Sequence, residues 1–322
     1  MVSISQKFGL KPLIKINRYS KAVLELTLAG IIWGASFTFV RWALEDFTAT
    51  TLMLWRFVIA FIVGEIILKL FQPEQYRNSW GDARLAVWAG VFLGISLFFQ
   101  TYGLNFTSAT NSGFITSLYV VLIPIISFVF FRTKIHPRHI VFSLMAFAGM
   151  GLLLDLKEFK LEKGELLTLC AALTAAFQIM FIGRVAKFAK SPFRFNTYQT
   201  FWSCITLLPF LIYETTAHHV PLFPTAPSFK ALASVVCLAL LVSVFAFYLQ
   251  VRAQRVLSTT TSSMLCLLEG PFAFIFAAIF LSERLNWVQA GGAVVILVSC
   301  ALSIYFDEEV ENDSALKTEI QN

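Results

Sequence analysis

The chain has 322 residues, of which 57% are hydrophobic and only 14% are charged, and its mean hydropathy is +0.74. Because a soluble domain carries roughly 25% charged residues to cover its surface, this composition excludes an ordinary soluble protein and indicates that lipid is the natural solvent. The formal net charge of +6 does not indicate nucleic-acid binding, since the basic residues form short clusters between long apolar runs. An anionic membrane surface is the expected partner of these clusters.

The two ends of the chain are predicted to lie outside the membrane. Residues 1–21 carry lysine and arginine among apolar residues, which is typical of a basic arm on a membrane surface and not of a signal peptide. Residues 307–322 are predicted to form an acidic tail. The cysteines all lie inside apolar runs without the two-residue spacing of a metal or redox pair, so we expect buried thiols, no metal and no cofactor.

Apolar runs long enough to cross a bilayer recur along the whole chain, since a spanning helix needs about 20 mostly apolar residues. The runs are too uniformly apolar for barrel strands, so the predicted fold is an all-α integral membrane protein with ten transmembrane helices. The predicted spans are 22–44, 50–71, 84–104, 108–131, 138–154, 164–184, 195–213, 230–251, 259–281 and 287–306.

The distribution of lysine and arginine predicts the orientation of these spans. The connections on one side, with both ends of the chain, hold 18 basic residues, and the connections on the other side hold 5. Both termini are therefore expected to face the cytoplasm.

The two halves of the chain are similar to each other. Segment 108–144 aligns without gaps with segment 258–294 at an offset of 150 residues. Each half, 22–154 and 164–306, contains five predicted spans, an odd number, so the second copy must be inverted relative to the first. Inverted repeats are characteristic of secondary transporters.

Several short stretches resemble the bacterial EamA-like branch of the drug/metabolite transporter superfamily. They are Trp33–Phe37, Trp55–Phe57, Gln100–Leu104, 243–260 (SVFAFYLQVRAQRVLSTT), 267–274 (LLEGPFAF) and 281–285 (LSERL). The resemblance covers nearly the whole chain. It implies an inverted-repeat bundle in the bacterial inner membrane, with a central cavity lined mainly by spans 1, 3, 4, 6, 8 and 9, and the export of amino acids, related metabolites or toxic compounds. The first repeat departs from the family where Arg132 follows Phe131, because the acidic residue common in that loop is absent.

Glu269 is the strongest candidate functional residue. It lies about ten residues from either end of the ninth predicted span, where an ionised carboxylate costs about 2.5–3.5 kcal/mol. It is either a hydrogen-bonded packing residue or a site for a substrate ammonium or a proton. Pro271 removes a backbone hydrogen bond two residues later, which is expected to leave the Leu267 carbonyl without its usual partner.

Other charged residues in the spans have simpler explanations. Arg56 lies about 9 Å inside the second span at 1.5 Å per residue, and it is either an interfacial anchor that extends to the surface or an anion site. Glu65 with Lys69, and Arg41 with Glu45, have the four-residue spacing of helical ion pairs.

Uncharged polar residues in the spans are candidates for a cavity lining, with interhelical packing as the alternative. Tyr119 aligns with Glu269 at the offset of 150. The candidate substrate-binding residues are Glu269, Tyr119, Trp33, Ser36, Asn111, Gln178 and Arg56. The candidate gating residues are Gln100, Gln250, Pro271 and Pro124.

These observations favour a secondary transporter, an exporter of small polar metabolites such as amino acids that works by alternating access. The sequence has no nucleotide-binding loop of the Walker type, so no use of ATP is expected. The expected partners are a small-molecule substrate, membrane lipid and, as a candidate coupling ion, the proton. A homodimer is a candidate assembly of the protein. A membrane-embedded enzyme acting on lipid is the alternative, and it would require a histidine or paired carboxylates at one depth.

Overall fold

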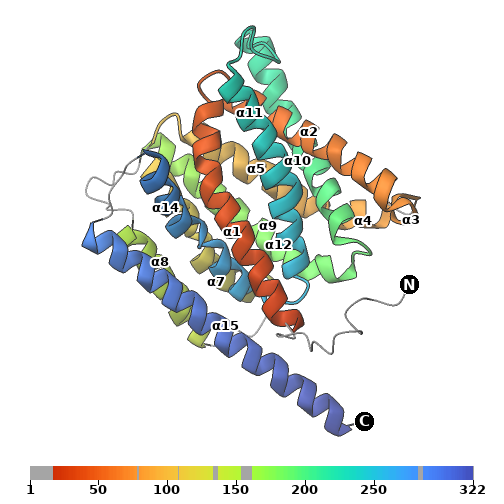
Figure 1. Cartoon of the computed structure of the whole chain (residues 1–322), viewed down its shortest axis with the longest axis vertical. Helices are drawn as coiled ribbons and strands as arrows, with labels where there is room; N and C mark the ends of the chain where they lie inside the picture. Colours follow the sequence, from red (N-terminus) through yellow and green to blue (C-terminus); the bar gives the residue numbers. More distant parts are fainter. Residues whose placement is uncertain are drawn as a thin grey trace, which may run out of the picture.

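In the computed structural model, residues 17–77, 80–107, 109–132, 137–153, 162–281 and 286–321 are described, and they form helices joined by turns and loops (Figure 1). The helices of the first half are α1 (Arg18–Ala43), α2 (Ala49–Phe71), α3 (Pro73–Arg77), α4 (Trp80–Leu85), α5 (Val87–Gly103), α6 (Ala109–Ser117), α7 (Tyr119–Phe131) and α8 (Pro137–Leu153). Those of the second half are α9 (Lys163–Val185), η2 (Ala186–Phe188), α10 (Pro192–Ala217), α11 (Phe229–Cys237), η3 (Leu238–Ala246), α12 (Phe247–Ala253), α13 (Thr259–Cys266), α14 (Glu269–Leu281) and α15 (Trp287–Gln321).

Small polar residues fix where several helices begin. The side chains of Asn17, Thr48, Ser191, Ser228 and Ser258 each accept a hydrogen bond from a backbone N–H in the first turn of the helix that follows. A helix leaves its first N–H groups without intrahelical partners, and such caps satisfy one of them at a gain of about 1 kcal/mol. These caps therefore fix the residues at which α1, α2, α10, α11 and α13 begin.

Six helical stretches in the described part of the chain are long and apolar enough to cross a membrane. They are Arg18–Ala43, Ala49–Phe71, Ser112–Phe130, Lys163–Phe188, Phe229–Ala253 and Trp287–Asp307, and Val87–Gly103 and Pro137–Leu153 are shorter apolar helices. Each predicted span falls on one helix or on consecutive helices. The chain is a helical membrane protein, while the total of ten spans and the inverted repeat remain predictions.

Two of the predicted spans are interrupted at corresponding places. The hydrogen bonding of the fourth span tightens at Leu118 between α6 and α7, and that of the ninth tightens at 267–268 between α13 and α14, while the backbone stays helical; these positions match at the offset of 150. As predicted, the Leu267 carbonyl lacks its usual partner four residues later, and it accepts a hydrogen bond from the Gly270 N–H at 3.0 Å instead. A tighter turn thus replaces the bond that Pro271 removes.

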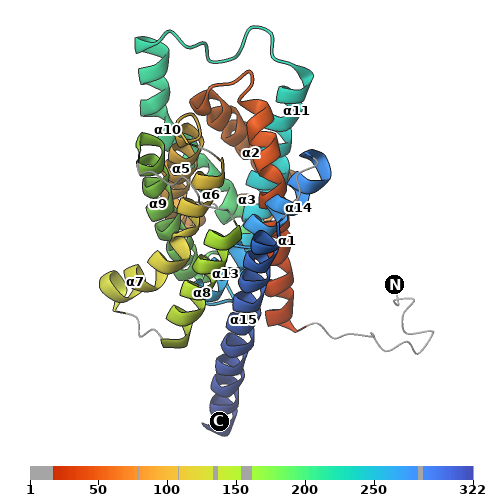
Figure 2. The same cartoon turned by 90° about the vertical axis from the view of Figure 1, so that its left-hand side faces the viewer.

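Helices from the two halves of the sequence alternate in the bundle. α1 packs on α14, η3 and α12, whereas α5 packs on α9 and α10, and α8 and α15 lie side by side at one edge (Figures 1 and 2). Close contacts depend on glycine at two places: a Cβ atom on Gly34 would lie 2.8 Å from the Ala273 nitrogen, and one on Gly90 would lie 2.5 Å from the Gln199 oxygen. Small residues allow helices in a membrane to approach this closely.

The first and last long helices meet at one end of the bundle. The Tyr19 hydroxyl donates a hydrogen bond to the Ile304 carbonyl at 3.0 Å, and Figures 1 and 2 show the start of α1 and the end of α15 on the same side. The structure thus places the start of α1 and the C-terminal end of α15 on one side of the bundle, and the assignment of that side to the cytoplasm remains a prediction.

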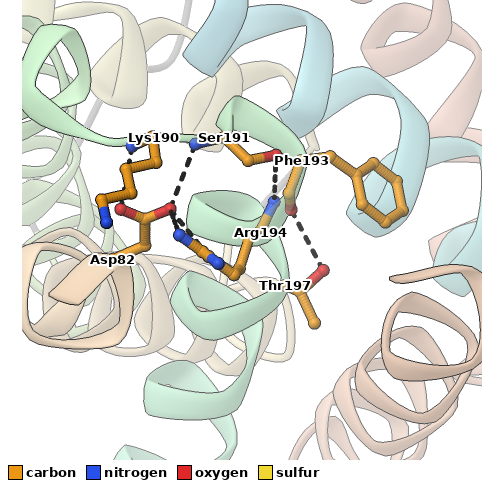
Figure 3. Close-up of polar contacts among 6 residues, drawn as sticks. All are labelled: Asp82, Lys190, Ser191, Phe193, Arg194 and Thr197. Atoms are coloured by element: carbon orange, nitrogen blue, oxygen red, sulfur yellow. Dashed lines mark hydrogen bonds and ion pairs between the residues drawn. The ribbon is translucent and has the colours of Figure 1, made fainter. Parts of the chain in front are cut away.

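A buried ion pair joins α4 to the first turn of α10 (Figure 3). Asp82 lies 2.6 Å from Arg194, and the two side chains are 3% and 0% exposed. The same carboxylate accepts hydrogen bonds from the Lys190 N–H at 2.9 Å, the Ser191 N–H at 3.1 Å and the Arg194 Nε at 2.8 Å. Asp82 thereby ties a helix of the first half to the N-terminus of α10 in the second half.

A second set of contacts joins the halves at the opposite end. Asp46 accepts hydrogen bonds from the N–H and the hydroxyl of Ser228, at 2.8 and 2.6 Å, which lower the pKa of this exposed carboxyl. Glu45 pairs with Lys230, so its predicted pairing with Arg41 is replaced by a contact between segments far apart in the sequence.

The predicted ion pair between Glu65 and Lys69 is also wrong. Among the described residues, Glu65 makes no ion pair, and one of its carboxylate oxygens is buried without a hydrogen-bond partner. Four-residue spacing allows such a pair but does not require it.

Candidate functional site

A cavity of about 110 Å³ lies in the middle of the bundle. A cavity needs a volume of about 10–15 Å³ to hold one water molecule. This cavity is therefore large enough for several waters or for a small polar molecule. Its walls come from α1, α2, α5, α6, α7, α9, η3, α12, α13 and α14, and hence from both halves of the chain. Its polar lining residues are Trp33, Ser36, Arg56, Ser96, Gln100, Thr101, Thr116, Tyr119, Gln178, Gln250 and Glu269.

Glu269 and Tyr119 enter the cavity from the two interrupted spans. Glu269 is the first residue of α14, and Tyr119 is the first residue of α7. The backbone N–H groups at the junction of α13 and α14 are hydrogen-bonded, because those of Leu267, Leu268 and Gly270 donate to carbonyls three residues earlier. Glu269 directly follows this tightened turn and lies on the cavity wall.

Arg56 lies against the same cavity, from α2. Its side chain is 3% exposed, so it does not reach an interface as an anchor would. Its Nε atom donates a hydrogen bond to the Ser243 hydroxyl at 2.8 Å. Within the described residues, its two terminal nitrogens make no hydrogen bond or ion pair with the protein.

Glutamines link the helices around the cavity. The Gln178 amide donates to the Gln250 oxygen at 3.4 Å, which joins α9 to α12. The Gln100 amide donates to the Thr116 hydroxyl at 3.2 Å, which joins α5 to α6. Gln100 and Gln250 both line the cavity, and their role as gates remains a prediction.

Two aromatic residues in the lining present hydrogen-bond donors. Trp33 is 8% exposed and Tyr119 is 4% exposed. Among the described residues, neither the Trp33 Nε1 nor the Tyr119 hydroxyl has a protein partner, whereas the Ser36 hydroxyl donates to the Trp33 carbonyl at 2.7 Å. Because a buried donor without a partner costs about 1–3 kcal/mol, both groups are suited to bind a polar molecule in the cavity.

Three candidate residues remain, namely Asn111, Pro124 and Pro271. Asn111 belongs to α6, but its side chain lies outside the described residues. Pro124 and Pro271 are buried in α7 and α14, and neither contributes to the cavity wall.

The sequence prediction missed part of the lining and the support beneath it. Ser96, Thr101 and Thr116 also line the cavity. Ser243 accepts a hydrogen bond from Arg56 but does not itself line the cavity. Serine and threonine are common in membrane helices because they can donate to their own backbone, so their presence alone gave no signal. The four-residue spacing of Ser96 and Gln100, which puts both on one face of α5, was the available signal.

The cavity presents one acidic and one basic side chain, surrounded by amides, hydroxyls and aromatic rings. No ion pair between Arg56 and Glu269 is found in the described structure. Both side chains are therefore available to polar or charged groups in the cavity. A central polar cavity between interrupted helices is typical of a membrane transporter.

Comparison with known proteins identifies the family. The model of the EamA-like transporter family matches residues 20–154 and again residues 162–305. The chain therefore belongs to the EamA-like transporter family, as the motifs in its sequence predicted.

Two relatives agree with this assignment, and one solved structure has a similar fold. An uncharacterized transporter of Archaeoglobus fulgidus is 31% identical over 86% of this chain and 84% of that protein. The uncharacterized transporter YetK of Bacillus subtilis is 23% identical over 88% of this chain and 87% of that protein. A solved structure, described only as "Crystal structure of protein", has 16% identity and a TM-score of 0.70 over 91% of this chain and 99% of that one, which supports the fold alone.

Proposed function

We propose that this protein is a secondary transporter that exports small metabolites carrying both an ammonium and an acid group, with amino acids as the principal class. One observation carries the proposal: Arg56 and Glu269 line the same central cavity. A substrate with both charges would satisfy both side chains at once. The family membership and the relatives named as transporters support the transport part of the proposal.

Each charged residue has a distinct role in this proposal. Glu269 accepts the substrate ammonium or, between substrates, a proton. The free guanidinium nitrogens of Arg56 donate to the acid group, a geometry in which arginine forms paired hydrogen bonds with a carboxylate. Tyr119, Trp33, Ser36 and Gln178 complete the pocket, and Asn111 lies on the helix that leads to it.

Alternating access is the proposed mechanism. The five-helix units 22–154 and 164–306 would act as inverted repeats, with the breaks at Leu118 and 267–268 as the points where the helices bend. Gln100 and Gln250, helped by Pro124 and Pro271, would separate the cavity from the two sides in turn. The protein would lie in the bacterial inner membrane with both termini in the cytoplasm.

The test is transport by the purified protein in liposomes. Labelled amino acids, the corresponding amines and the corresponding carboxylic acids are compared, with and without a proton gradient. We expect transport of compounds that carry both charges, and weaker transport of those that lack either one. Equal transport of amines and amino acids would contradict the role of Arg56, and transport that requires ATP would contradict the secondary mechanism.

A further inference from the structure

A short chain of buried contacts lies behind Arg56. The Ser243 hydroxyl accepts a hydrogen bond from the Arg56 Nε at 2.8 Å. The Asn196 amide, from α10, donates to the Ser243 carbonyl at 2.9 Å and to the Val244 carbonyl at 3.0 Å. Asn196 is 2% exposed and Ser243 is 0% exposed, so water does not compete for these bonds.

The backbone at Ser243 has an unusual conformation. Ser243 lies in η3, a π-helix, and the hydrogen bond from the Phe247 N–H to the Val242 carbonyl spans five residues. π-Helical turns are rare and occur mostly at functional sites. Where the spacing changes from five residues back to four, carbonyl groups need other donors, and the Asn196 amide supplies them to two neighbouring carbonyls.

We propose that Asn196 and Ser243 are positioning residues that hold the Arg56 guanidinium against the cavity as the site for the acid group of the substrate. Asn196 fixes the widened turn of η3, and the turn places the Ser243 hydroxyl on the Nε of Arg56. The bond at Nε leaves the two terminal nitrogens directed to the ligand. This inference rests on the proposed function, because it assigns a role in substrate selectivity to residues that do not line the cavity.

The arrangement determines which nitrogens of the arginine remain available. An arginine with no bond at Nε rotates about its side-chain torsions and loses paired hydrogen bonding with a carboxylate. Loss of Ser243 or Asn196 should therefore weaken recognition of an acid group and leave recognition of a neutral group unchanged. General damage to the bundle would affect both kinds of ligand equally.

The experiment compares amino acids with their carboxamides, in which a neutral amide replaces the acid group. Uptake of both is measured in liposomes that contain the full-length protein, for the wild type, Ser243→Ala, Asn196→Ala and Arg56→Gln. Because a hydrogen bond to a charged group contributes about 1.5–3 kcal/mol, we expect Ser243→Ala to raise the KM for the amino acid about tenfold or more. Asn196→Ala, which acts on Arg56 through Ser243, should raise it in the same direction. The KM for the carboxamide should not change, and Ser243→Thr, which keeps the hydroxyl, should restore the wild-type preference.

Ser203→Ala is the matched control. Ser203 is a fully buried serine of α10 that bonds to the Gly90 and Gln199 carbonyls, away from the cavity. It should leave the preference for the amino acid unchanged. If Asn196→Ala does not fold, the Ser243 variants still carry the test.

Each outcome of this comparison has a definite meaning. Equal effects on the amino acid and its carboxamide, or no effect on either, would overturn the positioning role. If Arg56→Gln keeps the wild-type preference, the acid-group site of the proposed function fails as well. If Arg56→Gln abolishes the preference but the Ser243 variants keep it, only the positioning role fails.

Discussion

The ion pair between Asp82 and Arg194 should be a major contributor to the stability of the bundle. The change Asp82→Asn keeps the size of the side chain and one carbonyl acceptor, but it removes the charge opposite Arg194. The carboxylate accepts three hydrogen bonds and lies 2.6 Å from the guanidinium. Removing one partner of a buried pair costs about 3–5 kcal/mol, because the other charge stays buried without compensation.

This loss should appear as a lower melting temperature of the detergent-solubilised protein. At roughly 2 °C per kcal/mol for a protein of this size, we expect Asp82→Asn to lower the Tm by about 6–10 °C. The double variant Asp82→Leu with Arg194→Met, which replaces both charges by apolar groups, should recover part of the loss. Glu45→Gln is the control, since its ion pair with Lys230 is about half exposed and such pairs contribute only about 0–1 kcal/mol. Equal Tm values for Asp82→Asn and the wild type would refute the reasoning.

Two further predictions concern the connections between helices. Hydrogen bonds from Ser228 hold the pKa of Asp46 below its usual range, so this contact stabilises the fold above the pKa of the unfolded chain and is lost as the pH falls through the lower folded value. Asp46→Asn should therefore melt at a lower temperature than the wild type at pH 7, and the difference should shrink as the pH falls towards about 3; a difference independent of pH would contradict this. Reporter fusions after Lys160 and Lys187 should lie on opposite sides of the membrane, and the same side for both would contradict the proposed topology.

The sequence was sufficient for the helical bundle because apolar runs of spanning length have few alternatives in lipid. It was also sufficient to mark Glu269, Tyr119 and Arg56 as unusual, since a charge or a hydroxyl inside such a run needs a partner. All three line the same cavity. Their roles in binding remain proposals.

Contacts between distant segments could not be predicted in this way. Glu45 had a suitable neighbour in Arg41 four residues earlier, but it pairs with Lys230, because the start of α11 lies beside the end of α1. Asp82 and Arg194 are each ordinary residues near a helix end in the sequence. Only the packing of α4 against α10 brings them together and buries them.

The contacts that position Arg56 could not be predicted from the sequence either. Ser243 is one serine in an apolar run, and the widened turn of η3 has no reliable local signal. The turn is held by the Asn196 amide, from another helix. Such a conformation depends on tertiary contacts that local propensity does not encode.

The most direct test of the account is the effect of Glu269→Gln on transport in liposomes. The amide keeps the shape and the hydrogen-bonding capacity of the carboxyl group but cannot ionise. Glu65→Gln is the matched control, because Glu65 is also a carboxylate within a membrane helix but does not line the cavity. We predict that Glu269→Gln abolishes amino-acid uptake, or its dependence on the proton gradient, with expression and Tm nearly unchanged, and that Glu65→Gln transports normally. Uptake by Glu269→Gln at the wild-type rate, with the wild-type pH dependence, would contradict the central claim and leave Glu269 as a packing residue.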